Sequence, residues 1–274
     1  MKKLSAFLLA ALFVITAILF TSCKTLTSYQ VFSEAMEKTE SLDSAEYTVK
    51  TKIKTKIGEM EITMPINYSV KASGLKSESP VFSGSMSMDL GFSKVEASIY
   101  NSGKYAYVST SGMKIKMDIS SDEGKDFDLS SIQEEFMANL SEDALKDVVF
   151  VQNDDGSKTM DIELTAEQFN KFFKEAYDSV YDQLIGDEES DVKADIKLEN
   201  TKLSIVINGD GYISKYALSY DMTVNVVADG EESSVFASVT SEIEFINPGQ
   251  PVEVTPPSDI DKYVSLEEAT ESFY

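Results

Sequence analysis

Cys23 is the residue whose surroundings point most clearly to a chemical reaction. It is the single cysteine in 274 residues, and it follows an almost wholly apolar run from Leu4 to Phe20 and the small residues Thr21 and Ser22. Two lysines precede that run. A basic start, an apolar stretch and small residues before a cleavage point form a secretory signal. The spacing predicts cleavage after Ser22 and transfer of acyl chains to the Cys23 thiol.

The order of these residues resembles a bacterial lipoprotein signal, and the alternative is an uncleaved membrane helix. The apolar run has 17 residues, which is at the short end for a helix that spans a bilayer. An unpaired cysteine in an exported protein is a reactive thiol, and acylation of Cys23 removes it. We therefore expect residues 1–22 to be a lipoprotein signal peptide and residues 23–27 a tether. Two or more acyl chains give stable anchoring, here outside the cytoplasm, in either an inner or an outer membrane.

The other residues able to do chemistry are almost all lysines and carboxylates. The chain has 24 basic residues, all of them lysine, 47 acidic residues and no histidine. It therefore lacks histidine for general-base catalysis or metal binding, and arginine for bidentate binding of phosphate. The carboxylates form no specific acid–base pair, and the acidic turns Asn153–Gly156, Asp187–Glu189 and Asn208–Gly211 lack the spacing of a calcium loop. We predict a non-catalytic protein without a metal or a cofactor.

The net charge is strongly negative. It is −23 for the whole chain, and removal of Lys2 and Lys3 with the signal makes it −25. A surface of this sign repels phosphates and anionic lipid headgroups, which makes nucleic acid an unsuitable partner. Contact with a membrane is therefore expected through the acylated Cys23, and the sequence names no protein partner.

Most of the chain alternates apolar and polar residues, as antiparallel strands with one wet face do. Six such segments follow one another between Ser44 and Ile119. A hairpin follows between Val148 and Leu164, and further strands lie between Val192 and Ile246, with a slip of phase near Asn200. This pattern predicts an antiparallel sheet of about ten strands.

Opposite charges suggest how the first two strands pair. Lysines occupy the polar positions of the first strand and glutamates occupy those of the second. A register that sets Lys54 across from Glu61 and Lys56 across from Glu59 brings these charges together, and favourable cross-strand pairs stabilise a sheet.

Helical periodicity marks four segments, at 27–42, 129–140, 165–184 and 265–273. The third begins with a capping box and carries a wide apolar stripe that includes Phe169, Phe172 and Phe173. Such a stripe needs a large apolar partner, which we expect to be the concave side of the sheet. No shift of composition marks a boundary, so we predict one domain over 28–274 with a helical insert at about 128–185.

This layout resembles the LolA/LppX-like superfamily of extracytoplasmic bacterial lipoproteins, in particular its uncharacterised lipoproteins. The stretches that carry the resemblance are Leu42–Ser44, Tyr100–Tyr105, Leu203–Met222 and Phe245–Val252 before Pro256 and Pro257. The resemblance implies an α+β fold, a strongly curved antiparallel β-sheet or half-barrel with helices packed on its concave side. Some members of that superfamily bind lipids or acyl chains between sheet and helices, and others act as envelope sensors.

Methionines gather on the apolar positions of the predicted strands. Methionine is flexible and polarizable, so surfaces that bind variable apolar ligands use it. The candidate ligand-binding residues are Met60, Met64, Met86, Met88, Met113 and Met117 on the sheet, with Phe169, Phe172 and Phe173 on the helix. They predict an anchored lipoprotein that binds a lipid or another apolar molecule. The alternative is an envelope interaction or sensor module, in which the same methionines fill a solid core.

Overall fold

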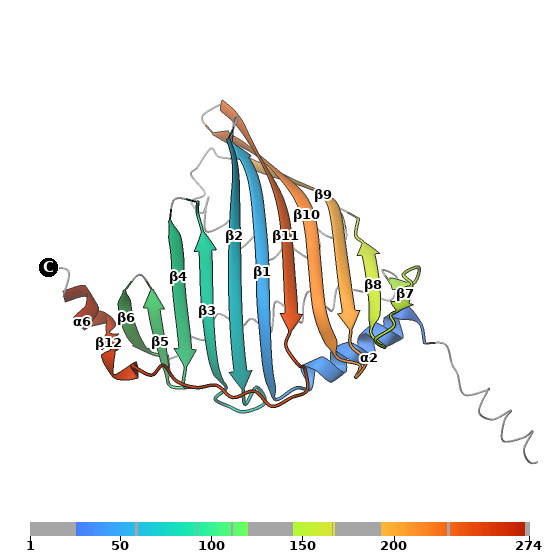
Figure 1. Ribbon diagram of the computed structural model, residues 1–274. Coiled ribbons are helices and arrows are strands. Elements are labelled where there is room, and N and C mark those ends of the chain that lie inside the picture. The colour runs from blue at the N-terminus through green and yellow to red at the C-terminus, as the bar shows by residue number, and fades with distance from the viewer. Residues whose placement is uncertain are drawn as a thin grey trace, which may run out of the picture.

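The protein is built on one open sheet of 12 strands, which Figure 1 shows as a continuous, twisted surface. The structure is a computed structural model, and it describes residues 26–57, 60–91, 93–110, 112–119, 145–165, 167, 193–228 and 231–271. Cys23, the signal residues, the helix expected at 129–140 and all of that expected at 165–184 except residues 165 and 167 lie outside these ranges. Helices packed on the concave side, as the sequence predicts, are therefore not shown.

The strands follow the order β12-β6-β5-β4-β3-β2-β1-β11-β10-β9-β8-β7 across the sheet, so among the described strands β12 and β7 are its edges and the sheet does not close. Their bounds are β1 Ser44–Ile57, β2 Met60–Ser73, β3 Val81–Asp89, β4 Lys94–Asn101, β5 Tyr105–Thr110, β6 Met113–Asp118, β7 Phe150–Gln152, β8 Lys158–Glu163, β9 Lys193–Ile207, β10 Ile213–Ala228, β11 Glu231–Phe245 and β12 Val264–Ser265. Adjacent strands are antiparallel except β12, which runs parallel to β6. The six-strand meander, the hairpin and the later strands are thus where the alternation places them.

The centre of the sheet joins the first strand to the eleventh. β1 pairs with β2 on one side and with β11 on the other, where Tyr47 lies opposite Phe245. In the first hairpin Lys56 lies opposite Glu61, and Lys54 lies opposite Thr63. The expected pairs with Glu59 and Glu61 are therefore wrong by two residues. The β-branched Ile57, a residue type that favours strands, continues β1 and pairs with Met60. This pairing shifts the register by two residues from the expected one.

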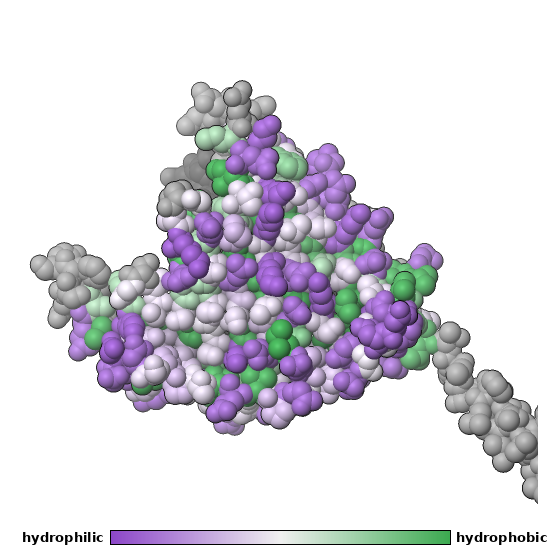
Figure 2. All heavy atoms as spheres, in the orientation of Figure 1, coloured by the Kyte–Doolittle hydropathy of each residue, from purple (hydrophilic) through white to green (hydrophobic). Residues whose placement is uncertain are grey.

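The alternation divides the sheet into two sides, here called the apolar face and the polar face. Cross-strand partners point to the same side of a sheet. Ile53 lies opposite Met64 and Val239 on the apolar face, whereas the next residue, Lys52, lies opposite Pro65 and Thr240 on the polar face. Figure 2 shows hydrophilic side chains spread across the strands, with apolar ones among them.

The sealed part of the core lies where helix α2 (Ser28–Glu40) covers the ends of β8, β9 and β10 (Figure 1). A capping box between Thr27 and Gln30 begins the helix, which satisfies backbone N–H groups that would otherwise lack partners. The cluster formed by its inner face and the strands includes Val31, Phe32, Ala35, Met36, Met160, Leu203, Ile205, Ile207, Ile213 and Tyr216. Full burial of a large apolar side chain stabilises the fold by roughly 1.5–3 kcal/mol.

A bulge interrupts β9 at the predicted slip of phase. Asn200 has a φ of 54°, in the left-handed region, and the pairing with β10 shifts between Ser219 and Asp221. Its side-chain amide donates a hydrogen bond of 2.7 Å to Asp221. Asparagine tolerates this backbone conformation better than most residues. The extra residue returns the apolar side chains on both sides of the bulge to the same face.

The C-terminal segment runs along the lower end of the sheet from β11 to β6 (Figure 1). This strap, residues 246–265, contains the short helix η2 (Ile260–Lys262) and ends in β12, which the alternation did not reveal. It is fastened near β6 by a hydrogen bond and ion pair from Lys114 to Asp259 and by the ring of Tyr263, 5.6 Å from that of Tyr107. Helix α6 (Leu266–Glu271) follows and contacts β6. Together they cover an edge that would otherwise be free to pair.

Candidate functional site

All six methionines proposed as ligand-binding residues on the sheet lie on the apolar face. Met86 lies opposite Tyr68 and Ala97, and Met88 lies opposite Ile66 and Val95. Met64 is therefore a diagonal neighbour of Met88 across β2 and β3, within reach of a long side chain. These three methionines form one patch.

The other three methionines are dispersed. Met113 and Met117 lie on β6, opposite Thr110 and Ala106, and β4 and β5 separate them from the patch on β3. Met60 lies at the outer end of β2 and is 66% exposed. The structure thus brings half of the predicted methionine set together. Phe169, Phe172 and Phe173 lie outside the part of the chain that the structure describes, so the enclosed cavity stays a prediction.

Burial changes along the apolar face. Under α2 the face is sealed, with Met160 and Ile205 both 0% exposed. Across β2 to β6, which we call the open half, Met64, Met86, Met88 and Met117 are only half-buried. Tyr68 and Ile99, also in this half, are 39% and 36% exposed. The open half is therefore an apolar surface with room for a partner.

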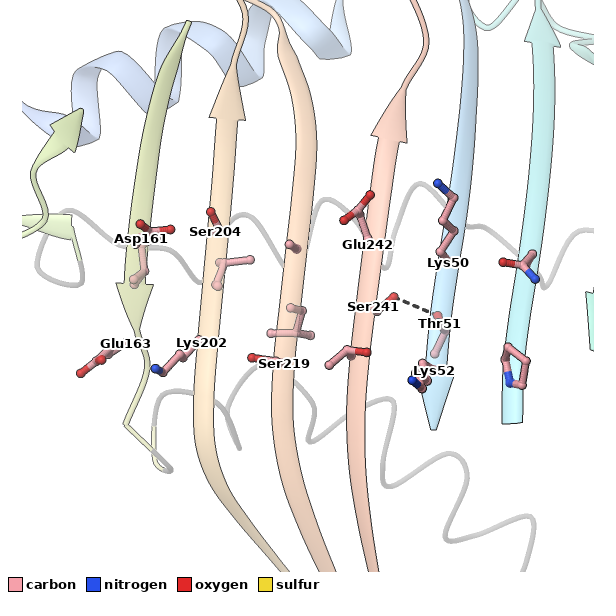
Figure 3. A pocket seen from close by; sticks show the side chains of 17 residues that line it. Lys50, Thr51, Lys52, Asp161, Glu163, Lys202, Ser204, Ser219, Ser241 and Glu242 are labelled. Atoms are coloured by element: carbon pink, nitrogen blue, oxygen red, sulfur yellow. Dashed lines mark hydrogen bonds between the residues drawn. The ribbon is translucent and has the colours of Figure 1, made fainter. Parts of the chain in front are cut away.

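The polar face contains a trough that sequence reasoning missed. It is an open hollow of about 680 Å³ across β8, β9, β10, β11, β1 and β2. Figure 3 shows Lys50 and Lys52 on β1 at one side and Lys202 and Glu163 at the other, with Ser219 between them. A second hollow of about 590 Å³ lies across β2 to β5 and shares Asn67 with the first. Lysines at alternate positions of β1 facing serines and threonines on other strands were the available signal.

Charges in the trough are unevenly paired. Lys215 beside it forms an ion pair of 2.6 Å with Glu242. Lys50, Lys52 and Lys202 line the trough, and among the described residues none of the three has a carboxylate oxygen within 4 Å. Lys202 lies opposite Glu163 in the β8–β9 register without forming such a pair. Three ammonium groups are thus left to solvent on one wet surface.

Three tyrosines of the apolar face are held neutral. Burial raises the pKa of Tyr47 and Tyr220 above the ordinary phenol value. It raises that of Tyr216 further, with an added contribution from the charge of Glu40, and the Tyr216 hydroxyl donates to the sulfur of Met36 at 3.6 Å. A group that stays protonated across the neutral range does not serve as a base there. These tyrosines are structural.

Neither metal nor membrane features appear in the described ranges. They contain no group of three or more His, Cys, Asp or Glu side chains placed to hold a metal ion. In the acidic turn before β8, the Asp155 carboxylate accepts hydrogen bonds from the Ser157 backbone and hydroxyl. These bonds hold the pKa of Asp155 below its usual value. None of the helices described there is both long and apolar enough to span a bilayer.

The fold and these surfaces define the class of the protein. It is built on a wide antiparallel sheet with one apolar and one polar face, and its described residues contain no assembled reaction centre. A family model of unknown function, DUF6612, matches residues 27–262. The chain belongs to this family. No curated protein sequence matches it.

The chain is similar at low levels to several solved structures, of which three are described. The crystal structure of LprF from Mycobacterium bovis is 12% identical with a TM-score of 0.37, covering 83% of this chain and 95% of that one. A putative AttH from Nitrosomonas europaea is 10% identical with a TM-score of 0.25, covering 78% and 54%. A DUF1329 family protein from Desulfovibrio piger is 9% identical with a TM-score of 0.25, covering 81% and 93%. TM-scores this low transfer no function to the chain.

Proposed function

We propose that this protein is an extracytoplasmic lipoprotein, anchored through acylated Cys23, that binds a lipid or another apolar molecule on the open half of its apolar face without chemical change. The observation that carries the proposal is the unequal burial of one continuous face. α2 seals one end completely, whereas Met64, Met86 and Met88 at the other end keep access to solvent. Contiguous apolar surface of this kind marks interaction sites, and methionine adapts to ligands of varied shape.

The binding test replaces methionines by the similarly shaped but polar glutamine. The double variant Met86→Gln/Met88→Gln alters the apolar face of β3, and Ser85→Gln/Ser87→Gln alters the polar face of the same strand. The readouts are titration with a fluorescent fatty acid and mass spectrometry of lipids retained by the purified protein. Loss of roughly 1.4 kcal/mol of apolar contact weakens binding tenfold, so the methionine variant should bind about ten times less tightly. Lipid-free wild-type protein that does not bind the probe, or equal binding by both variants, would contradict the proposal.

The anchor has a separate test. Cys23→Ser removes the acylation site, and mass spectrometry after expression in a bacterium should find acyl chains on residue 23 of the wild-type protein and none on the variant. A protein held by an uncleaved helix would stay in the membrane fraction, because that helix does not depend on the thiol. Wild-type protein that keeps residues 1–22 and carries no acyl chain on Cys23 would therefore exclude the lipid anchor while leaving the binding test unaffected.

One observation favours the alternative, an envelope interaction or sensor module. Val149 and Val151, beside and within edge strand β7, are 76% and 59% exposed. An exposed edge can accept an added strand from a partner. A protein that carries no lipid but captures an extended peptide on β7 would fit this second function.

A further inference from the structure

The polar-face trough has the geometry of a small-anion site. Successive cross-strand pairs place Lys52, Thr240, Ser219 and Lys202 in one row across β1, β11, β10 and β9. Three strand spacings separate the two lysines, which is about 14 Å between their Cα atoms. Their long flexible stems allow both ammonium groups to turn inward over the two hydroxyls between them.

The floor of the trough leaves room for a guest. Ser204, Ala217 and Ser219 line it from β9 and β10, and all three are half-buried. Their short side chains produce the hollow of about 680 Å³. Hydroxyl groups donate and accept hydrogen bonds, so a guest with oxygen atoms finds partners on the floor as well as charges at the sides.

The trough does not share the strong negative charge of the protein. Lys50, Lys52 and Lys202 line the trough with Asp161, Glu163 and Glu242, and Lys215 is ion-paired to Glu242. The three positive and three negative side chains of the lining cancel, in a chain whose net charge is −23. Lysines elsewhere on the polar face, such as Lys94 and Lys197, have glutamate partners at 2.5 and 2.6 Å. Lys50 lies opposite Glu242 and Lys202 lies opposite Glu163, but the trough lysines differ from Lys94 and Lys197 in having no carboxylate oxygen of the described residues within 4 Å.

We propose that this trough binds a small anion with a phosphate-type group, held by Lys50, Lys52 and Lys202 over the hydroxyls of Ser219 and Thr240. A compact anion fits better than a long polyanion, because the strongly acidic remainder of the surface repels extended negative charge. The group has two possible sources, a soluble phosphate ester or the headgroup of an anionic phospholipid. The site lies on the opposite face of the sheet from the proposed apolar site.

The test compares two double variants that remove the same charge. Lys52→Gln/Lys202→Gln empties the trough of two ammonium groups, and Lys94→Gln/Lys197→Gln removes two exposed, ion-paired lysines of the same face. All four positions are exposed, and exposed substitutions usually leave the fold intact, which circular dichroism would check. The probes are glycerol 3-phosphate by calorimetry and phosphatidylglycerol vesicles by sedimentation, with phosphatidylcholine vesicles as the reference.

We expect saturable binding of one phosphate group per chain, weakened at least tenfold in the trough variant and unchanged in the control. Tighter binding of glycerol 3-phosphate would identify a soluble ester as the source, and tighter binding of the anionic vesicles would identify the headgroup. Absence of saturable binding to either probe, or equal weakening by both double variants, would overturn the proposal.

Discussion

Thr39 offers the sharpest test of how α2 is attached to the sheet. Its hydroxyl accepts a hydrogen bond of 2.9 Å from the backbone N–H of Ile213, at the start of β10. The same hydroxyl donates one of 2.7 Å to the carbonyl of Ala35, one turn earlier in the helix. Thr39 is 7% exposed and Ile213 is 0% exposed, so water does not replace either bond. One oxygen atom therefore joins the last turn of α2 to the core strand.

Replacement of Thr39 by valine keeps the shape and removes the oxygen. The Ile213 N–H is then buried without an acceptor, which costs about 1–3 kcal/mol. The control Thr39→Ser keeps the hydroxyl and loses one methyl group, at about 0.8 kcal/mol. A loss of about 1–3 kcal/mol lowers the melting temperature by about 2–12 °C for a chain of this size.

Urea unfolding measures both variants. The midpoint for Thr39→Val should fall further than that for Thr39→Ser, with the slope unchanged, because the surface exposed on unfolding is the same. If Thr39→Val is as stable as Thr39→Ser or more so, the Ile213 N–H finds another partner and the hydroxyl does not hold the helix. A changed slope would instead mean that the substitution alters the compactness of the unfolded or native state.

Two further predictions concern the strap. Gly249 has a φ of +89°, and a Cβ added there would lie 2.8 Å from the Tyr212 ring. Gly249→Ala should therefore lower the free energy of unfolding by about 1–3 kcal/mol, measured by thermal unfolding. An unchanged melting midpoint would contradict this. Lys114 donates a hydrogen bond to Asp259 and holds the pKa of that carboxyl below its usual value. The contact therefore stabilises the fold fully when the pH is above the pKa of an unfolded Asp, about 4. This stabilisation is lost as the pH falls through the lower pKa of the folded state. Hydrogen exchange in residues 252–265, corrected for intrinsic rates, should be faster at pH 3 than at pH 7, and Asp259→Asn should abolish this difference. Equal pH dependence in the wild-type protein and the Asp259→Asn variant would count against the ion pair.

The strands themselves were predictable because their residues alternate. Period-two patterning reveals which side of a strand is buried, and it placed β1 to β6, the bulge at Asn200 and the face on which Met86 and Met88 lie. The helical spacing of Val31, Phe32, Ala35 and Met36 likewise predicted α2, and the structure confirms all four as buried. The architecture agrees with the LolA/LppX-like resemblance as far as a large antiparallel sheet.

Partner strands were not predictable from the same pattern. Alternation identifies a face and says nothing about which strand lies alongside, so the pairing of β1 with β11 required the structure. β12 has two residues, too few for a period to appear. The trough was missed because lysines at alternate positions also describe an ordinary wet face. What distinguishes them is the position of Lys52 across from Thr240 and of Lys202 across from Ser219, with no carboxylate oxygen of the described residues within 4 Å.

The pairing of β1 with β11 determines when the protein can fold. β1 ends at Ile57, yet one of its edges has no partner strand until β11, Glu231–Phe245, has been synthesised. Closing so long a loop costs entropy before any contact compensates for it, which makes the step slow. A truncated chain that stops short of residue 231 would leave one edge of β1 without a partner strand. That edge could pair with any extended polypeptide, and the chain would aggregate.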